Sequence, residues 1–305
     1  MLKHKTVRRI AYALFGLAAL AACLYWTFPA QAVGQRLAYE IHRRSQGHWT
    51  ASFDDVSPYR LTGLMARGVH LKHNIGDTNP EEFYADAVKA RLRILPLFLL
   101  RVSFKVQVDL GKGSLYAKVR NASDRFELAV ELEDLDLASP PNLPKWLGLP
   151  LGGKLDGEID ATVAKDPKAT TGTIALSLTN GQFGPGTVSG FTLPRVSLGR
   201  VNLKLDMAAG RFQVASFEQQ GGDIKMRLTG SGQARMDLGT SSLDLCAAAR
   251  VEPAFLEQNA NLKAALQLAE VRISRDVDGF LHLPFGGPLT AINLKSGLCR
   301  QAGSQ

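Results

Sequence analysis

The chain contains only three cysteines in 305 residues. Three thiols are too few for the disulfide framework of a small secreted domain and for a zinc site with four cysteine ligands. Runs of like charge are missing as well, since no five consecutive residues carry charges of one sign. Hydrophobic residues make up 45% of the chain, which excludes disorder as its main state. We therefore expect a packed fold without covalent or metal cross-links as its framework.

Motifs of common catalytic sites are also absent. The chain contains neither the Gly-x-Ser-x-Gly turn of many hydrolases nor the glycine-rich phosphate loop that ends in Lys-Ser or Lys-Thr. His70 and His73 form the only close histidine pair of the body, but positions three apart on a strand face opposite sides. We interpret them as two surface histidines. The sequence thus predicts no catalytic residue, no cofactor and no metal site.

Clustered carboxylates do not alter this expectation. Asp54 and Asp55 are adjacent, and Glu133 and Asp134 lie close to Asp136. A calcium loop needs several oxygen ligands around a glycine at the bend, and neither cluster has that spacing. We interpret them as solvent-facing strand and turn residues.

Positive charge is concentrated at the N-terminus. Of the net charge of +8, Lys3, Lys5, Arg8 and Arg9 contribute half, which leaves 32 basic against 28 acidic residues in the body. Nucleic-acid binding would require a basic stripe interleaved with aromatic residues, and the basic residues of the body are scattered. We expect no nucleic-acid partner.

An uncharged run extends from Ile10 to Val33. Its length suits a transmembrane helix, which needs about 20 residues. The basic residues before it place the N-terminus in the cytoplasm, and Tyr25 and Trp26 suit the far interface of the bilayer. We therefore predict a cytoplasmic tail at 1–9 and a single-pass anchor at 10–32, with the remaining chain outside the cytoplasm.

Two other interpretations of this run stay open. Ala30-Gln31-Ala32 has the form of a signal-peptide cleavage site, and Leu20-Ala21-Ala22-Cys23 has the small residues that precede a lipidated cysteine. Cleavage, lipidation at Cys23 and an uncleaved anchor all place the body in the same compartment.

The body has the period of two that is typical of strands with one buried face. Val102, Phe104, Val106 and Val108 alternate with polar residues, and similar runs recur between short turns that contain Gly, Asn-Gly or Asp-Pro. We predict a short linker helix at 33–46, a mainly β domain at 47–302 and a frayed tail at 303–305. The expected fold is an extended antiparallel meander with one further short helix near 253–265.

Such a sheet must bury its apolar face, and the sequence leaves open how it does so. A closed barrel, a second sheet as in a sandwich, or an open groove that holds acyl chains would each satisfy the pattern. A second open question concerns Cys246 and Cys299, the only cysteines of the body, which could form a disulfide in an oxidising compartment.

The order of these features resembles a known family. A basic N-terminus and a membrane span ending in Phe28-Pro29-Ala30 precede Leu61-Thr62-Gly63-Leu64 with Gly68 and Val69, and Leu149-Pro150-Leu151-Gly152-Gly153 follows later. Further shared positions are Asp166-Pro167-Lys168-Ala169, Leu193-Pro194, Gly221-Gly222-Asp223, Ser242-Leu243-Asp244-Leu245 and Asp278-Gly279-Phe280. Together they resemble the type II secretion system protein N (GspN) family, and more distantly the AsmA-type proteins that handle lipids.

The resemblance implies a non-catalytic accessory of the bacterial type II secretion system, anchored in the inner membrane with its body in the periplasm. Its expected partners are the inner membrane and other secretion components of the envelope. The AsmA-type alternative implies a lipid-binding or lipid-bridging protein with phospholipid in an apolar groove. Homo-oligomers are compatible with both, because an open meander has two unpaired edge strands.

Overall fold

The structure is a computed structural model that describes residues 25–299 except 46, 48, 61, 74–80, 94–101, 122–123, 139–149, 189–190, 234–240, 270–274, 289–292 and 296–298. Residues 8, 12, 15–16, 19–20 and 23 are described as well. The predicted tail at 303–305 lies outside these residues, as do most of 1–9 and part of the predicted anchor at 10–32. The anchor therefore stays a prediction. Among the described residues, no helix combines the length and the apolar character needed to cross a membrane.

Fourteen described strands form one antiparallel sheet in which almost every strand pairs with its neighbours in the chain. The strands are β1 (Trp49–Tyr59), β2 (Gly63–His73), β3 (Glu81–Leu92), β4 (Val102–Leu110), β5 (Gly113–Asn121), β6 (Arg125–Asp136), β7 (Leu151–Ala164), β8 (Thr171–Phe183), β11 (Val196–Ala208), β12 (Arg211–Gln220), β13 (Ile224–Gln233), β14 (Ser242–Val251), β15 (Leu281–Pro288) and β16 (Asn293–Leu294). Between β8 and β11, a small hairpin of β9 (Gly186–Val188) and β10 (Phe191–Leu193) forms a separate sheet. The predicted mainly β meander is confirmed.

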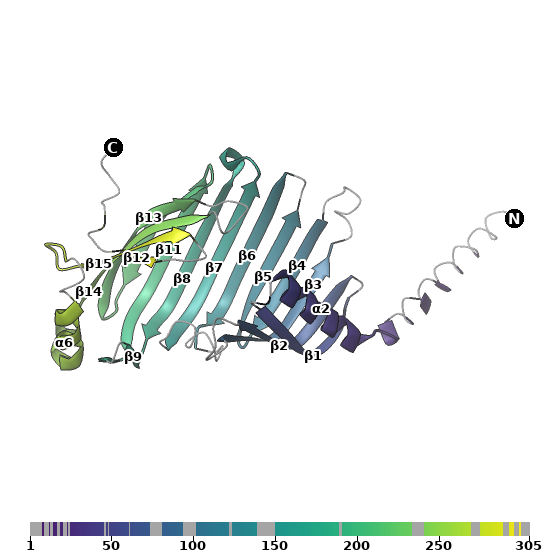
Figure 1. Ribbon diagram of the computed structural model, residues 1–305, viewed down its shortest axis with the longest axis horizontal. Coiled ribbons are helices and arrows are strands. Elements are labelled where there is room, and N and C mark those ends of the chain that lie inside the picture. The colour runs from purple at the N-terminus through teal and green to yellow at the C-terminus, as the bar shows by residue number, and fades with distance from the viewer. Residues whose placement is uncertain are drawn as a thin grey trace.

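Helices flank the sheet at its two ends, namely α2 (Ala30–Arg44), α5 (Pro253–Gln258) and α6 (Ala260–Ala269). The 3-10 turn η1 (Pro167–Ala169) lies in the connection between β7 and β8. Figure 1 shows the strands side by side in chain order, with α2 against the N-terminal strands and α6 beyond the other end. The helix expected near 253–265 is thus two helices, separated at Asn259, and Pro253 begins the first of them as a residue with a fixed φ can.

Helix α2 begins at Ala30, three residues before the expected start at 33, and Pro29 is its N-terminal cap. Three carboxyl-terminal residues, His42, Arg43 and Arg44, lie where positive charge is favourable for the helix dipole. The helix is a packing element as well as a connection, since Gly34 is buried and brings its backbone close to Val56 of β1.

The core of the described chain lies between α2 and the first strands. Val56, Ala66, Val69, Ala85, Leu110 and Leu135 are buried in it, and Phe28, Val33 and Leu37 pack against them. Phe53 and Val56 both join this core although they are three residues apart, because the alternation of β1 slips by one residue at the exposed pair Asp54 and Asp55. Opposite this slip, Gly68 of β2 has a φ of 55°.

Gly68 therefore generates a stability prediction. A Cβ at this position would collide with the Asp54 carboxylate, and alanine would also be strained at a positive φ. We expect Gly68→Ala to lower the free energy of unfolding by at least about 2 kcal/mol, measured by chemical denaturation.

Gly221→Ala is the matched control. Gly221 has a φ of 75°, but a Cβ there would meet no atom within 4 Å. Gly221→Ala should lower the free energy of unfolding by only about 1 kcal/mol, which is the cost of backbone strain alone. Equal losses in the two variants would contradict the proposed collision with Asp54.

Candidate functional site

One face of the main sheet carries no charge from β4 to β15. Antiparallel partners place their side chains on the same face, so the register identifies its members. One continuous row of partners across ten strands is Phe104, Val119, Leu128, Ala161, Gly172, Met207, Phe212, Gly232, Leu243 and Gly287. A second row is Val106, Ala117, Val130, Ile159, Ile174, Leu205 and Val214. We call this surface the apolar face.

Polar side chains are rare on the apolar face. In the regular, described parts of β4 to β15 they are Asn121 and Gln219. Gln219 is already saturated within the chain, since its amide donates to the carbonyl oxygens of Leu198 and Ile224 and accepts from the backbone N–H of Met226. The apolar face therefore offers almost no hydrogen-bonding group to a ligand.

The opposite surface, here called the polar face, carries the charges. Lys89 of β3 contacts Asp109 of β4 at 2.7 Å, and Arg120 of β5 contacts Glu127 of β6 at 2.6 Å. Each pair joins neighbouring strands. The sheet is therefore amphipathic across its whole width, as the period of two predicts.

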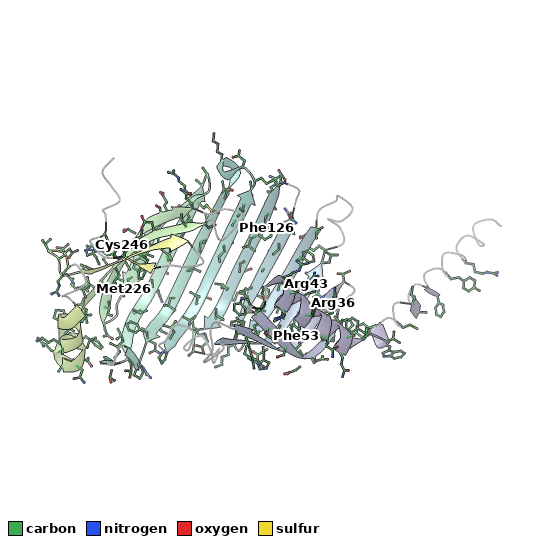
Figure 2. The ribbon with its side chains drawn as sticks, viewed as in Figure 1. Arg36, Arg43, Phe53, Phe126, Met226 and Cys246 are labelled. Carbon is green, nitrogen blue, oxygen red and sulfur yellow. A yellow bond between two sulfur atoms is a disulfide. The ribbon has the colours of Figure 1, made fainter. Side chains whose placement is uncertain are left out.

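No described element packs over the middle of the apolar face. Helix α2 covers it at β1, whereas α6 packs against α5 and the β9–β10 hairpin. Apart from Leu110, Gly113 and Leu135, the apolar-face residues in the regular parts of β4 to β15 are not buried, and Phe104 is 42% exposed. Figure 2 labels two members of the face, Phe126 of β6 and Met226 of β13. Among the residues that the structure describes, the second sheet of a sandwich is absent.

A hollow of about 550 Å³ crosses β5 to β8 near the strand ends. Most of its lining residues belong to the polar face, among them Arg120, Glu127 and Asp160, and Val119, Leu128 and Ala161 occupy the alternate positions between them. The hollow therefore lies mainly on the polar face.

The structure joins the two body cysteines in a disulfide. Cys246 of β14 and Cys299 have Cα atoms 5.6 Å apart, within the range that a disulfide spans. The bond attaches the chain near its C-terminal end to β14 across a sequence separation of 53 residues. Cys23, the alternative lipidation site, is an exposed free cysteine.

Sequence reasoning missed His282, which lies beside this disulfide. Its Nδ1 accepts the backbone N–H of Cys299 at 3.1 Å, and its Nε2 is 3.1 Å from Asp276 Oδ2. The possible ligand atoms of Cys246, His282 and Cys299 lie within 4.8 Å of one another. Both ring nitrogens and both sulfurs are already engaged, so this arrangement does not suit a metal ion. Only the register of β14 and β15 reveals the cluster.

The other carboxylates and histidines singled out from the sequence remain apart from it. Asp54 and Asp55 are exposed on β1, Asp134 pairs with Lys154 at 2.9 Å, and the His70 ring lies against Tyr84.

The pKa of Asp276 lies below its ordinary value. Burial alone would raise this pKa, but the backbone N–H of Phe280, at 2.8 Å, and His282 favour the carboxylate and outweigh it. The ionised carboxylate thereby links the turn before β15 to the disulfide region.

Comparison of the chain with families of known proteins, with curated proteins and with solved structures found no match. The resemblance to GspN and AsmA-type proteins therefore stays a prediction.

The disulfide gives a prediction about stability. Closing a loop of this length stabilises a fold by about 4 kcal/mol in the chain-entropy estimate. We expect the double substitution Cys246→Ser and Cys299→Ser to lower the free energy of unfolding by about 2 to 4 kcal/mol in urea titrations. Cys23→Ser is the control and should match the wild type. Unchanged unfolding of the double variant would show that the bond does not stabilise the fold.

Asp276 gives a prediction about pH. Because its pKa is lower in the folded chain than in the unfolded chain, the carboxylate stabilises the fold above the unfolded value of about 3.9. This contribution disappears as the pH falls through the lower folded pKa. We expect Asp276→Asn to lower stability at neutral pH and to flatten its decline below about pH 4. Unfolding midpoints along a pH series measure both effects, and parallel curves for the two proteins would refute this role.

Proposed function

We propose that this chain is a non-catalytic, membrane-anchored lipid-binding protein of the bacterial envelope, whose apolar face holds phospholipid acyl chains. The observation that carries the proposal is the uncharged, uncovered surface that extends over ten neighbouring described strands. The anchor and the periplasmic location are the expectations drawn from the sequence. The distant resemblance to AsmA-type proteins supports the same function.

The size of the face requires a cover. Ten strands at a spacing of about 4.8 Å span about 40 Å, and about six residues of each strand add roughly 20 Å. The resulting surface, on the order of 800 Å², exceeds the about 300 to 600 Å² of the largest apolar patch on a typical monomer. Exposing it to water costs about 25 cal/mol per Å², which favours an apolar ligand.

Acyl chains fit this face better than a protein partner does. Protein interfaces carry about one hydrogen bond per 100 to 200 Å², and Asn121 is the one apolar-face side chain among the described strands that could supply hydrogen bonds to a partner. Acyl chains require no such bonds.

A second candidate is the accessory role in type II secretion. It is favoured by the resemblance to GspN and by β1, which has an unpaired edge in the described sheet that could accept a strand from a partner or from a second copy. Deleting the gene and measuring exoprotein export tests this role. Intact export would exclude it and leave lipid binding unaffected.

Lipid binding is tested with charges placed on either face. In the full chain, Ala117→Asp with Ala161→Asp puts two carboxylates on the apolar face. We expect native mass spectrometry to show bound phospholipid on the wild-type chain and at least about a tenfold loss of it on this variant, because an unpaired charge is costly against acyl chains.

The control substitutes the same residue type on the polar face of neighbouring strands. Ala129→Asp with Ala175→Asp should retain the wild-type amount of lipid. Equal lipid content in both variants, or a wild-type chain free of lipid, would overturn the proposal.

A further inference from the structure

A group of basic residues lies on the polar face at the ends of β3 to β5. Arg91, Lys105 and Lys118 are direct cross-strand partners in one row. Arg60, in the turn after β1, and Lys118 line the same pocket of about 280 Å³ with Arg91 and Lys105. The sequence separates these residues widely, and the register assembles them.

These cations are not balanced by carboxylates. Elsewhere on the polar face, Lys89 is paired with Asp109 and Arg120 with Glu127. Within the part of the chain that the structure describes, Arg91, Lys105 and Lys118 contact no carboxylate. Glu131 is the one acidic residue among the described residues that line the pocket. The site therefore keeps a surplus of positive charge.

Arg91 and Lys105 are half-buried, which makes their proximity costly. Burial lowers the pKa of Lys105, and repulsion from Arg91 and Lys118 lowers it further. Like charges directly opposite each other destabilise a sheet. The fold tolerates this repulsion without a compensating carboxylate, which points to an external anion.

The pocket is shaped by neutral groups around the cations. Tyr59 and Tyr116 line it, and Gly63 lies between Tyr59 and Arg91 in the row of partners. The Arg60 guanidinium lies over the Tyr59 ring, 5.4 Å from its centre. A Cβ on Gly63 would lie 2.9 Å from Arg91 Cβ, so a glycine at this position lets β2 approach Arg91 closely.

The sequence that follows β3 favours a membrane as the source of the anion. Arg93 is followed by seven uncharged, predominantly aliphatic residues, 94–100, and then by Arg101. Apolar segments bordered by basic residues are typical of chains that lie at the interface of an anionic membrane. A free anion or a nucleic acid would not require the apolar residues.

We propose that this basic pocket binds the phosphate of an anionic phospholipid headgroup at a membrane surface. Arg91, Lys105 and Lys118 supply the charge, and Arg60 closes one side. The pocket lies on the polar face, opposite the apolar face, so the proposal does not depend on acyl chains being bound there.

The test uses the full chain reconstituted in nanodiscs of phosphatidylcholine. Vesicles of phosphatidylcholine with one third phosphatidylglycerol are added, and co-flotation is measured against vesicles of phosphatidylcholine alone. The wild-type chain should bind only the anionic vesicles, and added salt should weaken the binding.

The decisive variant combines Arg91→Gln, Lys105→Gln and Lys118→Gln. Each basic side chain near an anionic surface contributes roughly a fivefold gain in binding, so the variant should lose about a hundredfold. Lys112→Gln, Lys165→Gln and Lys168→Gln remove the same charge from exposed turns and should lose only a few-fold. A similar loss in both variants would overturn the proposal.

Three further outcomes would also overturn it. Displacement of the vesicles by millimolar sodium phosphate, but not by sodium chloride at equal ionic strength, would assign the pocket to a free anion. Displacement by a single-stranded oligonucleotide at similar concentration would assign it to a nucleic acid. A lower melting temperature of the pocket variant would show that the cations stabilise the fold, whereas relief of their repulsion should leave it unchanged or raise it.

Discussion

The structure depends on the burial of one side of a wide sheet. Antiparallel pairing satisfies the backbone of each strand, but it also collects every second side chain on one surface. From β4 to β15 that surface is uncharged. In the described chain, α2 covers it only at the first strands, where Phe28, Val33 and Leu37 complete a core with Val56. Beyond the first strands, the alternation of apolar and polar residues that drives folding leaves the apolar face uncovered, and its contact with water is unfavourable.

The sequence predicts the sheet because alternation is a local property. Val102 to Val108 identify β4 without knowledge of any other strand, and the turns between runs predict a meander because short turns join antiparallel neighbours. Whether the buried side would face a second sheet is a non-local question. Strands of the same length, joined by the same turns, can form either a sandwich or an open sheet. The sequence pattern alone therefore does not distinguish these two arrangements. The slip at Asp54 and Asp55 was also hidden, since it depends on the backbone of Gly68 in the next strand.

The candidate sites are harder to predict from the sequence than the sheet is, because their residues come together only through strand pairing. Arg91 and Lys118 are far apart in the sequence, and composition indicates a body with nearly balanced charge. Pairing through β4 places both directly beside Lys105. The pairing of Cys246 with Cys299 is easier to predict from the sequence, because the body has only these two thiols. His282 and Asp276 had no signal in the sequence, since their roles arise from β15 lying next to β14.

The glycines within the apolar face explain how an uncovered surface can still be well formed. A Cβ on Gly157 would lie 2.6 Å from Leu176 Cδ2 and 3.3 Å from Leu132 Cδ1, and a Cβ on Gly232 would collide with the Phe212 ring. Large side chains of neighbouring strands thus lie over the glycine positions and pack sideways within the same layer. The layer gains part of its packing energy from these lateral contacts and does not need a second layer to order its side chains. What remains toward water is a continuous hydrocarbon surface, and long, flexible acyl chains can follow such a surface because they require contact area and no matching polar groups.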